Sequence, residues 1–522
     1  MSTRLSSSGD PSERTGVTGE SVAGPSSAVL SDSICASSDG RERDPAQVDW
    51  SDRGFDWSDR GLIEQAIGES LPNSVADRDT LDRLYARAKD ALGLVVAEID
   101  ERVCEQVNAI LHHPRFQALE ASWRGLWSLV EQGQSGVREA PLQVRVLSMQ
   151  RGEWIHDITT AADFDRSALW QKIYEEELGM AGGFPFGLIV GDFSVGRNPR
   201  DLIGLEGLAG IGAAALCPIV LGADPSLLEL DRWTELPKVH ELESVFDAPD
   251  FVRWRSFRGK ADSKYIGLAM PRVLMRLPYD GTETRRFCFR EQAGERHLDR
   301  YLWGNAAYVF ARVVMRSFAN YSWPADIRGV ERGMETGGLV TDLPRDTFST
   351  DSPGVVAKPA VEVILTEGHE DRLARLGLIP LTHCHDTPYA AFHSSQSLHK
   401  AQQYSTAAAS ANARLATMLQ YTLCVCRVAH YVKVMGRDAI GSGVDAKNLR
   451  RKLDRWLKGY VADKEDASQR ERAERPLRKA EVAVDPHPTQ PGTYQCQLDL
   501  WPHYQIDQMT TSVRLSTSFV KR

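Results

Sequence analysis

Residues 186–221 constrain the fold most, because strand-like and helix-like patterns alternate there over a short length. Residues 186–192 are an apolar run that ends in a turn, residues 202–215 have a helical pattern, and residues 217–221 are a second apolar run. The helix carries small residues at spacings that let a neighbouring element pack closely: Gly204, Gly207, Gly210 and Gly212. A strand–helix–strand succession is typical of α/β proteins, so we predict a mixed α/β (α+β) fold.

The residue patterns divide the chain into parts. We predict a disordered tail and linker (1–60), an N-terminal helical segment (61–140), an α/β core (141–370) and a C-terminal region with helices and terminal β-strands (371–522). The tail is rich in Ser, Gly, Asp and Arg, and it has too few large apolar groups to offset the entropy of ordering. At its end Asp-Trp-Ser-Asp-Arg-Gly occurs twice, at 49–54 and 56–61, either as a linker duplication or as a docking motif.

Helical periodicity governs residues 81–130. Apolar residues recur there at three- and four-residue steps, Pro114 interrupts the pattern, and an aromatic stripe continues through Trp123 and Trp127. This spacing predicts two amphipathic helices.

Further strands and a helix are expected in the core. Residues 142–147 alternate between apolar and polar side chains, which is typical of a half-buried strand, and residues 361–365 indicate another strand. Residues 370–376 predict a short helix that ends at Gly377, because glycine readily adopts the backbone conformation that closes a helix.

Helices are predicted again in the C-terminal region. Residues 407–435 favour one long helix that breaks near Gly436, and a second helix follows with an apolar face. The opposite face of this second helix is basic, with Lys447, Arg451, Arg455 and Lys458. Such a face is either solvated charge or a docking surface for an acidic partner.

Alternating segments end the chain. Residues 480–485 and 494–500 are separated by a loop rich in proline and predict a β-hairpin, and residues 512–516 predict a third strand. The apolar positions of the two hairpin strands are candidate inter-subunit residues: Val482, Val484, Tyr494, Cys496, Leu498 and Leu500. An isolated two-stranded hairpin is marginally stable and leaves backbone edges open, so we expect it to need further strands.

Bulk properties exclude several classes of protein. A net charge of -9 and a pI near 5.9 argue against binding nucleic acid through overall charge. The eight cysteines have no disulfide-like spacing, and the sequence begins without the apolar stretch of a secretory signal. The most apolar window, 203–221, contains Glu206 and Pro218, so we expect neither membrane insertion nor export, and we predict a cytoplasmic protein.

Motifs of enzymes are missing from the sequence. It has no phosphate-binding loop ending in Gly-Lys-Ser/Thr, no Gly-x-Ser-x-Gly elbow and no His-Glu-x-x-His helix. The chain is therefore predicted not to be an enzyme and to need no cofactor.

One cluster resembles a metal site in composition. It comprises His383, Cys384, His385, His393, His399, Cys424 and Cys426. Neighbouring residues on a strand point to opposite faces, and residues two apart on a helix diverge, so this spacing is poor for tetrahedral zinc. We keep a soluble metal-dependent hydrolase that uses the His/Cys cluster at 383–426 as the alternative interpretation.

A series of segments from about residue 80 to the end of the chain is distinctive in content and order: 110–126, 267–279, 301–308, 325–330, 337–340, 376–381, 427–433, Trp456, 460–461, 475–478, 480–482 and 502–504. Through this ordered series the chain resembles the TssC/VipB family, the large subunit of the contractile type VI secretion sheath. The sequence departs from the family pattern mainly before residue 75 and in the His-rich stretch 383–399.

The resemblance implies a phage-tail-sheath-like fold and a structural role. A subunit of this family pairs with a small sheath subunit, TssB/VipA, and the pairs polymerise from a baseplate around an inner tube of Hcp. This tube is then the first candidate for the acidic partner of the basic face at Lys447, Arg451, Arg455 and Lys458. Contraction propels the tube, a ClpV-type AAA+ unfoldase recycles the contracted sheath, and neighbouring subunits exchange β-strands. The sheath is a cytoplasmic assembly anchored at the membrane.

Overall fold

A computed structural model describes residues 78–135, 142–239, 241–281, 287–293, 298–331, 333–347, 358–439, 445–462, 464, 467–486 and 494–503. The chain divides into two compact units, Met1–Ala97 and Glu98–Arg522. The predicted tail, the repeated hexapeptide and the predicted strand at 512–516 lie outside the described residues. In the described part, no helix is both long enough and apolar enough to cross a membrane.

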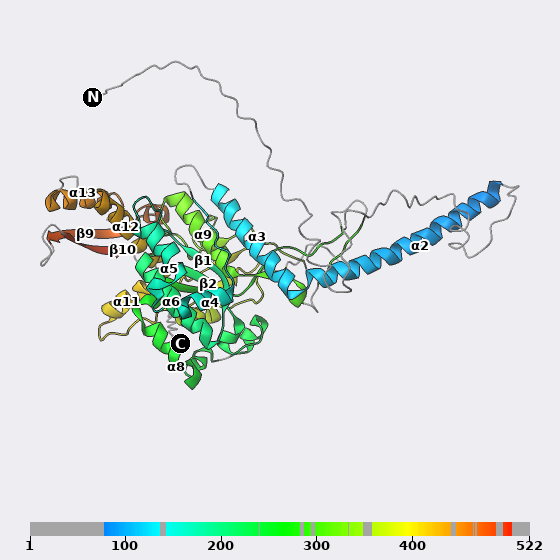
Figure 1. Cartoon of the computed structure of the whole chain (residues 1–522), viewed down its shortest axis with the longest axis horizontal. Helices are drawn as coiled ribbons and strands as arrows, with labels where there is room; N and C mark the ends of the chain where they lie inside the picture. Colours follow the sequence, from blue (N-terminus) through cyan, green and yellow to red (C-terminus); the bar gives the residue numbers. More distant parts are fainter. Residues whose placement is uncertain are drawn as a thin grey trace, which may run out of the picture. The chain divides into compact units, whose positions relative to one another are not determined.

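The architecture is mixed α/β, as predicted, with helices first, a mixed sheet in the core, and helices with a hairpin at the end (Figure 1). The helices are α2 (Arg78–Leu111), α3 (Pro114–Ser135), α4 (Arg151–Thr160), α5 (Ala168–Trp170), α6 (Pro199–Ala215), α7 (Leu242–Val245), α8 (Val252–Gly259), α9 (Ala306–Tyr321), α10 (Glu367–Arg375), α11 (Ala407–Ala416), α12 (Leu419–Ala439), α13 (Ala446–Lys458) and α14 (Gln469–Glu474). The strands are β1 (Ile189–Val195), β2 (Ile219–Ala223), β3 (Ile266–Met270), β4 (Val273–Leu274), β5 (Trp303–Gly304), β6 (Leu339–Val340), β7 (Leu378–His383), β8 (Ala390–Phe392), β9 (Leu477–Pro486) and β10 (Tyr494–Pro502).

A six-stranded sheet forms the core, in the order β1-β2-β3-β7-β8-β6. Strands β1, β2, β3 and β7 are parallel to one another, and β8 pairs antiparallel with both β7 and β6. Helix α6 connects β1 to β2, which is the parallel crossover that the alternating pattern predicted. Because β7 and β8 belong to this sheet, the sheet continues past the boundary that we placed at residue 370.

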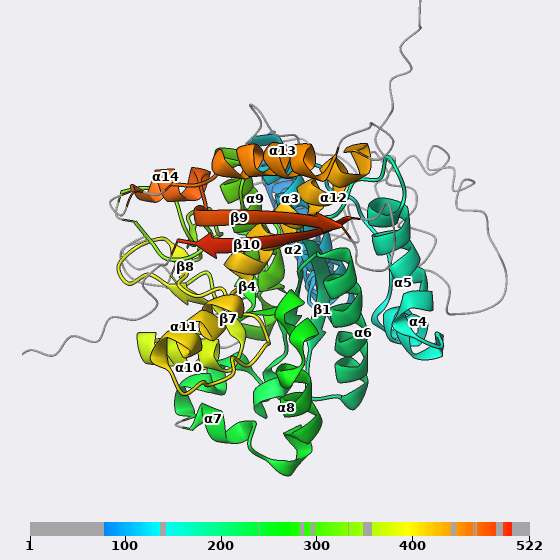
Figure 2. The ribbon, with the colours of Figure 1, turned by 90° about the vertical axis from the view of Figure 1, so that its left-hand side faces the viewer.

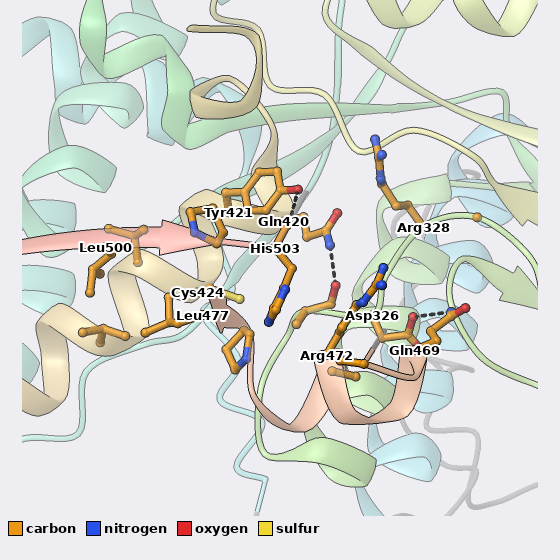
Figure 3. A pocket seen from close by; sticks show the side chains of 18 of the residues that line it. Asp326, Arg328, Gln420, Tyr421, Cys424, Gln469, Arg472, Leu477, Leu500 and His503 are labelled. Carbon is orange, nitrogen blue, oxygen red and sulfur yellow. Dashed lines mark hydrogen bonds between the residues drawn. The ribbon is translucent and has the colours of Figure 1, made fainter. Parts of the chain in front are cut away.

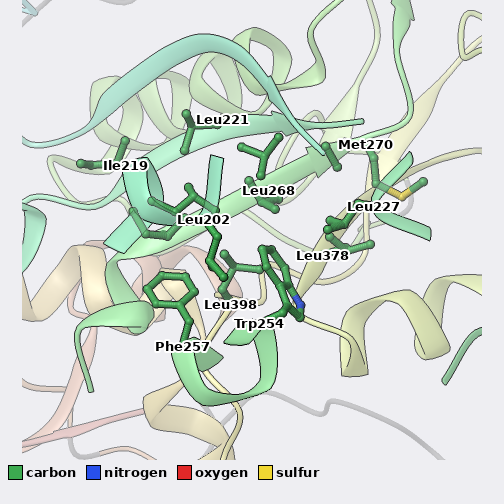
Figure 4. Close-up of a cluster of buried hydrophobic side chains, with 14 of the residues drawn as sticks. Leu202, Ile219, Leu221, Leu227, Trp254, Phe257, Leu268, Met270, Leu378 and Leu398 are labelled. Atoms are coloured by element: carbon green, nitrogen blue, oxygen red, sulfur yellow. The ribbon is translucent and has the colours of Figure 1, made fainter. Parts of the chain in front are cut away.

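The two faces of the sheet pack against different helices because neighbouring strand residues point to opposite sides. Ile219 and Leu221 of β2 face a cluster that includes α6 and α8, part of which Figure 4 shows. Val220, between them, faces the other cluster, which contains α9 and the start of α12. The near-continuous apolar run of β2 is therefore explained by burial on both faces.

The glycines of α6 allow close packing, as the sequence suggested. A Cβ atom at Gly204 would lie 2.6 Å from the Trp154 ring, and one at Gly207 would lie 2.4 Å from Cγ2 of Ile158. Trp154 and Ile158 are buried residues of α4. Helix α4 can therefore approach α6 only because these positions lack side chains.

Gly207→Ala should lower the free energy of unfolding by about 1–2 kcal/mol, because overpacking outweighs the gain in helix propensity. The control is Gly436→Ala in α12, where nothing lies within 4 Å of the added Cβ. The control should raise the free energy of unfolding by about 0.5–1 kcal/mol. Urea denaturation measures both, and equal effects of the two substitutions would contradict the packing argument.

An ion cluster joins α3 to the core. Arg276 donates from Nη1 to Oε2 of Glu291 at 2.5 Å and from Nε to Oε1 of Glu120 on α3 at 2.6 Å. Nε2 of His112 lies 3.2 Å from Oε1 of Glu291. Burial acts to raise the pKa of Glu120, but hydrogen bonds from Arg276 and Arg124 outweigh it and hold the pKa below its usual value.

Three predicted elements are wrong. Residues 142–147 form no strand, and residues 361–365 contribute only a single bridge from Val361 to Val273. The helix predicted over 407–435 is interrupted earlier, where α11 ends and α12 begins, and α12 continues through Gly436. The backbone at Ser395 and Ser397 explains the early break, because it bonds to Leu419 and Thr417 and pins the chain there.

Candidate assembly surfaces

The predicted hairpin is present and regular. Strands β9 and β10 are antiparallel, and Val482 lies directly opposite Leu498. Five of the predicted inter-subunit residues have described side chains. Val482 and Val484 are buried, Leu498 and Leu500 are half-buried, and Cys496 is exposed. Tyr494 begins β10, opposite Pro486.

The apolar face of the hairpin packs on the C-terminal helices of the same chain. Val482 and Val484 share a buried cluster with Leu453 and Leu457 of α13 and with Val428 of α12. Figure 2 shows α13 running along the hairpin. The burial that the alternation predicts is thus provided within the chain, by α12 and α13.

Pairs of aromatic rings stabilise the packing of α12 and α13 beneath the hairpin. Trp323 lies edge-on to Tyr460 at 4.9 Å between ring centroids, and Trp456 lies edge-on to Tyr431 at 5.7 Å. Edge-to-face pairs at these distances add to the stability gained from burial. The helices α12 and α13 therefore give the hairpin a rigid support.

The outer surface of the hairpin is polar. Within the described residues, no other strand joins β9 and β10, although a parallel bridge links Leu477 at the start of β9 to Val461, with backbone hydrogen bonds to Tyr460 and Ala462. Asp499 lies directly opposite Glu481, and Lys479 pairs with Glu481 at 2.6 Å. Open edges with hydrogen-bonding groups along them are templates for strand addition.

The structure places the predicted basic residues on the exposed side of α13. Lys447, Arg451, Arg455 and Lys458 are all exposed, while Leu453 and Leu457 of the same helix are buried. Lys458 pairs with Asp454 of the same helix at 2.7 Å. Among the described residues, no ion pair involves Lys447 or Arg455.

A cavity of about 410 Å³ lies at the foot of the hairpin (Figure 3). Its polar lining includes Asp326, Arg328, Gln420, Tyr421, Arg472 and His503. The Nε2 amide of Gln420 donates to the Ala325 carbonyl at 2.6 Å, and Oδ1 of Asp326 accepts from Gln469 at 3.0 Å. Burial, together with the charges of Arg472 and Arg478, lowers the pKa of His503.

No local sequence pattern links Asp326, Arg328 and Gln420. Asp326 and Arg328 lie in a loop after α9. Gln420 lies in α12, about ninety residues further along the chain. Only tertiary packing brings them together. The one sequence signal was indirect, because residues 325–330 are among the segments that resemble the sheath family.

The His/Cys residues between 383 and 426 do not assemble. Nδ1 of His399 lies 3.0 Å from Oγ of Ser263 and 2.9 Å from the Lys260 carbonyl oxygen, which accepts, and His385 lies beside Asp386 on the surface. Burial raises the pKa of Cys424 to about 12, which keeps this thiol protonated. In the described part of the chain, no group of three or more His, Cys, Asp or Glu side chains could hold a metal ion.

Comparison with known proteins assigns the chain. Residues 94–399 match the family described as EvpB/VC_A0108, tail sheath N-terminal domain, and residues 408–519 match the EvpB/VC_A0108, tail sheath gpW/gp25-like domain. The chain is 39% identical over 427 residues to the type VI secretion system sheath protein TssC1 of Pseudomonas aeruginosa PAO1, covering 81% of this chain and 84% of that protein.

A solved structure, the 6-fold symmetrised baseplate of the anti-feeding prophage, is similar at a TM-score of 0.31 and 10% identity over 60% of this chain and 66% of that chain. This similarity is too low to bear on the fold. The family matches and the identity to TssC1 are sufficient, and they confirm the resemblance found in the sequence. The chain belongs to the TssC/VipB family and is a contractile sheath subunit of a type VI secretion system, a structural protein and not an enzyme.

Proposed function

We propose that this sheath subunit pairs with a small subunit of the TssB/VipA type, polymerises around an inner tube of Hcp protein, and contracts to propel that tube. The observation that carries the proposal is the β9–β10 hairpin. It is packed on α12 and α13 through one face, and in the described residues its edges are joined by no further strand beyond the bridge of Leu477 to Val461. Strands from neighbouring subunits would complete this sheet.

The hairpin also suits contraction. Hydrogen bonds along a strand edge are repeated and directional, so neighbours remain joined while the bodies they belong to rotate. The linkers to the exchanged strands would absorb that rotation. We further propose a cytoplasmic sheath that starts on a baseplate and is recycled by a ClpV-type AAA+ unfoldase.

Coexpression with the small subunit tests the proposal. Negative-stain electron microscopy of the soluble material should show tubes with a helical repeat. The chain expressed alone should give poorly defined oligomers, because its open edges and exposed apolar side chains lack their partners. A stable monomer that neither binds the small subunit nor forms tubes would contradict the proposed function.

The basic face of α13 is proposed to dock on an acidic surface, with the inner tube as the candidate. Lys447→Glu with Arg455→Glu should lower the amount of tube-containing sheath, because both side chains are exposed and neither has an ion-pair partner among the described residues. The apolar side of α13 is unchanged, so the fold should persist. Electron microscopy would count sheaths with and without a central tube, and we expect a decrease of about tenfold if the two charges together supply 1.4 kcal/mol.

A matched control separates this effect from net charge. Arg166→Glu with Lys172→Glu makes the same change in charge at exposed positions elsewhere. The control should leave tube-containing sheaths at the wild-type level. Equal loss in both double variants, or no loss in either, would remove α13 from the tube interface.

A further inference from the structure

A buried carboxylate joins the two sheath domains that the chain contains. Asp326 lies in the loop after α9, within the domain at 94–399, and is only 4% exposed. Its Oδ2 atom accepts a hydrogen bond from the backbone N–H of Gly337 in the same domain at 2.8 Å. Its Oδ1 atom accepts from Nε2 of Gln469 at 3.0 Å, in α14 of the domain at 408–519 (Figure 3). The two oxygens of one side chain therefore bind the two domains.

The surrounding backbone fixes where this carboxylate lies. The N–H of Asp326 donates to Oγ of Ser317 in α9 at 3.0 Å, and this hydroxyl donates to the Trp323 carbonyl at 2.9 Å. Gly337 has a φ of 63°, a conformation that favours glycine. Asp326 is thus held in the core independently of Gln469.

Apolar packing holds α14 only weakly. Of its six residues only Ala473 is buried, and a methyl group removes little apolar area from water. The cavity of about 410 Å³ lies against this helix, where Gln469, Arg472 and Ala473 line it. Polar contacts therefore contribute much of what holds α14 on the core.

Three residues of the loop after α9 contact three different parts of the C-terminal domain. The Trp323 ring lies 4.9 Å from the Tyr460 ring, which follows α13, measured between centroids. The Ala325 carbonyl accepts from Gln420 of α12 at 2.6 Å. The third contact is the one from Asp326 to α14. This loop is therefore a junction between the two domains.

The contacts differ in what they can fix. Burial of Trp323 stabilises the junction, but the hydrophobic effect has no direction. A hydrogen bond weakens steeply when its donor turns away, so the contact to α14 restricts the angle between the domains. Only two residues separate the end of α14 from Leu477, where β9 begins, so a change in that angle reaches the hairpin.

We propose that Asp326 is a positioning residue, whose contact with Gln469 fixes the angle of the C-terminal domain on the core so that the β9–β10 hairpin meets neighbouring subunits in one orientation. The proposal rests on the proposed function, because a fixed orientation matters for polymerisation.

Gln469→Glu tests the contact. It places a second carboxylate against Asp326, and like charges at hydrogen-bond distance repel each other in a partly buried site. In coexpression with the small subunit, the yield of tubes in electron microscopy should fall at least about tenfold. Amides 472–475 of α14 should exchange with solvent at least about tenfold faster, whereas the amides of α6 should not change.

Exchange of the two partners supplies the rescue. In Asp326→Asn the remaining oxygen accepts from Gly337, and the Gln469 amide turns its oxygen toward the new N–H group, so the yield of tubes should stay within about twofold of wild type. In Asp326→Asn with Gln469→Glu the new amide donates to the new carboxylate. Both the yield of tubes and the exchange of α14 should then return to near the wild-type level. Damage confined to position 469 would not be reversed by a change at 326.

The matched control is Gln171→Glu. It makes the same chemical change at an exposed position, the first residue of the π-helix Gln171–Gly179, and should leave tubes and exchange unchanged. A Gln469→Glu variant with normal tubes would overturn the proposal, whether or not α14 exchanges faster. A double variant that forms no more tubes than Gln469→Glu would overturn it as well.

The results distinguish two failures. If the wild-type chain forms no tubes with the small subunit, the proposed function is wrong, and this proposal fails with it. If the wild type forms tubes and Gln469→Glu forms as many, the function stands and the positioning role of Asp326 is wrong.

Discussion

Proline at Val482 or Leu498 should abolish sheath polymerisation, with the yield of tubes at least tenfold below wild type, while binding to the small subunit is impaired less. These residues lie directly opposite each other in the β9–β10 pair. Proline has no backbone N–H and is tolerated poorly within a strand ladder. Electron microscopy and copurification with the small subunit measure the two effects separately.

The register explains why both substitutions should act. Directly opposite residues of an antiparallel pair have their N–H groups either both between the strands or both on the outer edges. In the first case proline breaks the hairpin itself, and in the second case it removes donors that a neighbouring strand would use. The adjacent pair, Ala483 and Gln497, has the opposite orientation.

Proline at Ala483 or Gln497 is therefore the matched comparison. All four variants should lose polymerisation, but only the pair with inward N–H groups should also lower the melting temperature of the complex with the small subunit. Sheaths of normal length from the double variant Val482→Pro/Leu498→Pro would refute strand exchange at this hairpin. Tubes formed by the proline variants of the pair whose N–H groups point outward would also refute strand exchange at this hairpin.

Arg276→Met should have the largest effect on stability, a loss of about 3–5 kcal/mol in the free energy of unfolding. The side chain of Arg276 is 7% exposed and that of Glu291 only 1% exposed, so the substitution leaves a buried carboxylate without its cation. Glu120 of α3 loses a hydrogen-bond donor at the same time. Urea denaturation followed by tryptophan fluorescence measures the loss.

An exposed ion pair provides the control. Arg102 and Glu98 are in contact at 2.6 Å but are 76% and 62% exposed, so Arg102→Met should change the free energy of unfolding by less than about 1 kcal/mol. A loss of similar size in both variants would mean that burial does not determine the strength of the Arg276 cluster.

The Arg276 cluster also predicts a pH dependence. The pKa of Glu120 is lowered from 4.5 in the folded state, so this group stabilises the fold above pH 4.5 and loses that contribution as the pH falls through its folded pKa. In Arg276→Met the main donor that lowers this pKa is gone. The part of the acid sensitivity that comes from Glu120 should then decrease, as urea denaturation between neutral and acidic pH would measure.

Local sequence patterns predicted the helices and strands correctly where the packing or pairing partner of the element lies nearby in the chain. The apolar runs that became β1 and β2, the small-residue helix α6 and the hairpin β9–β10 all have pairing partners nearby in the chain. Alternation predicted strands at 142–147 and 361–365 as well, but a strand exists only when a second strand lies beside it. Val361, Val363 and Leu365 are buried without forming a ladder. The alternating pattern there reflects which side chains are buried and does not indicate a paired strand.

The basic and apolar sides of α13 could be predicted because helical spacing fixes which residues share a side. The ion cluster of Arg276, Glu291 and Glu120 could not, because those residues are separated by up to 171 positions and no local pattern links them. The cavity that Asp326, Gln420 and His503 line could not be predicted either, because these residues are also far apart in the chain.

The sequence by itself determined the family, the mixed α/β class and the faces of the terminal hairpin, since each depends on residue types at short, fixed spacings. Only the tertiary structure decided that β7 and β8 extend the core sheet and that, among the residues it describes, the His/Cys side chains stay apart and 142–149 form no strand pair. The physical reason is common to all three. Strand pairing, metal coordination and backbone satisfaction depend on which distant segments meet, and periodicity within one segment carries no information about its partner.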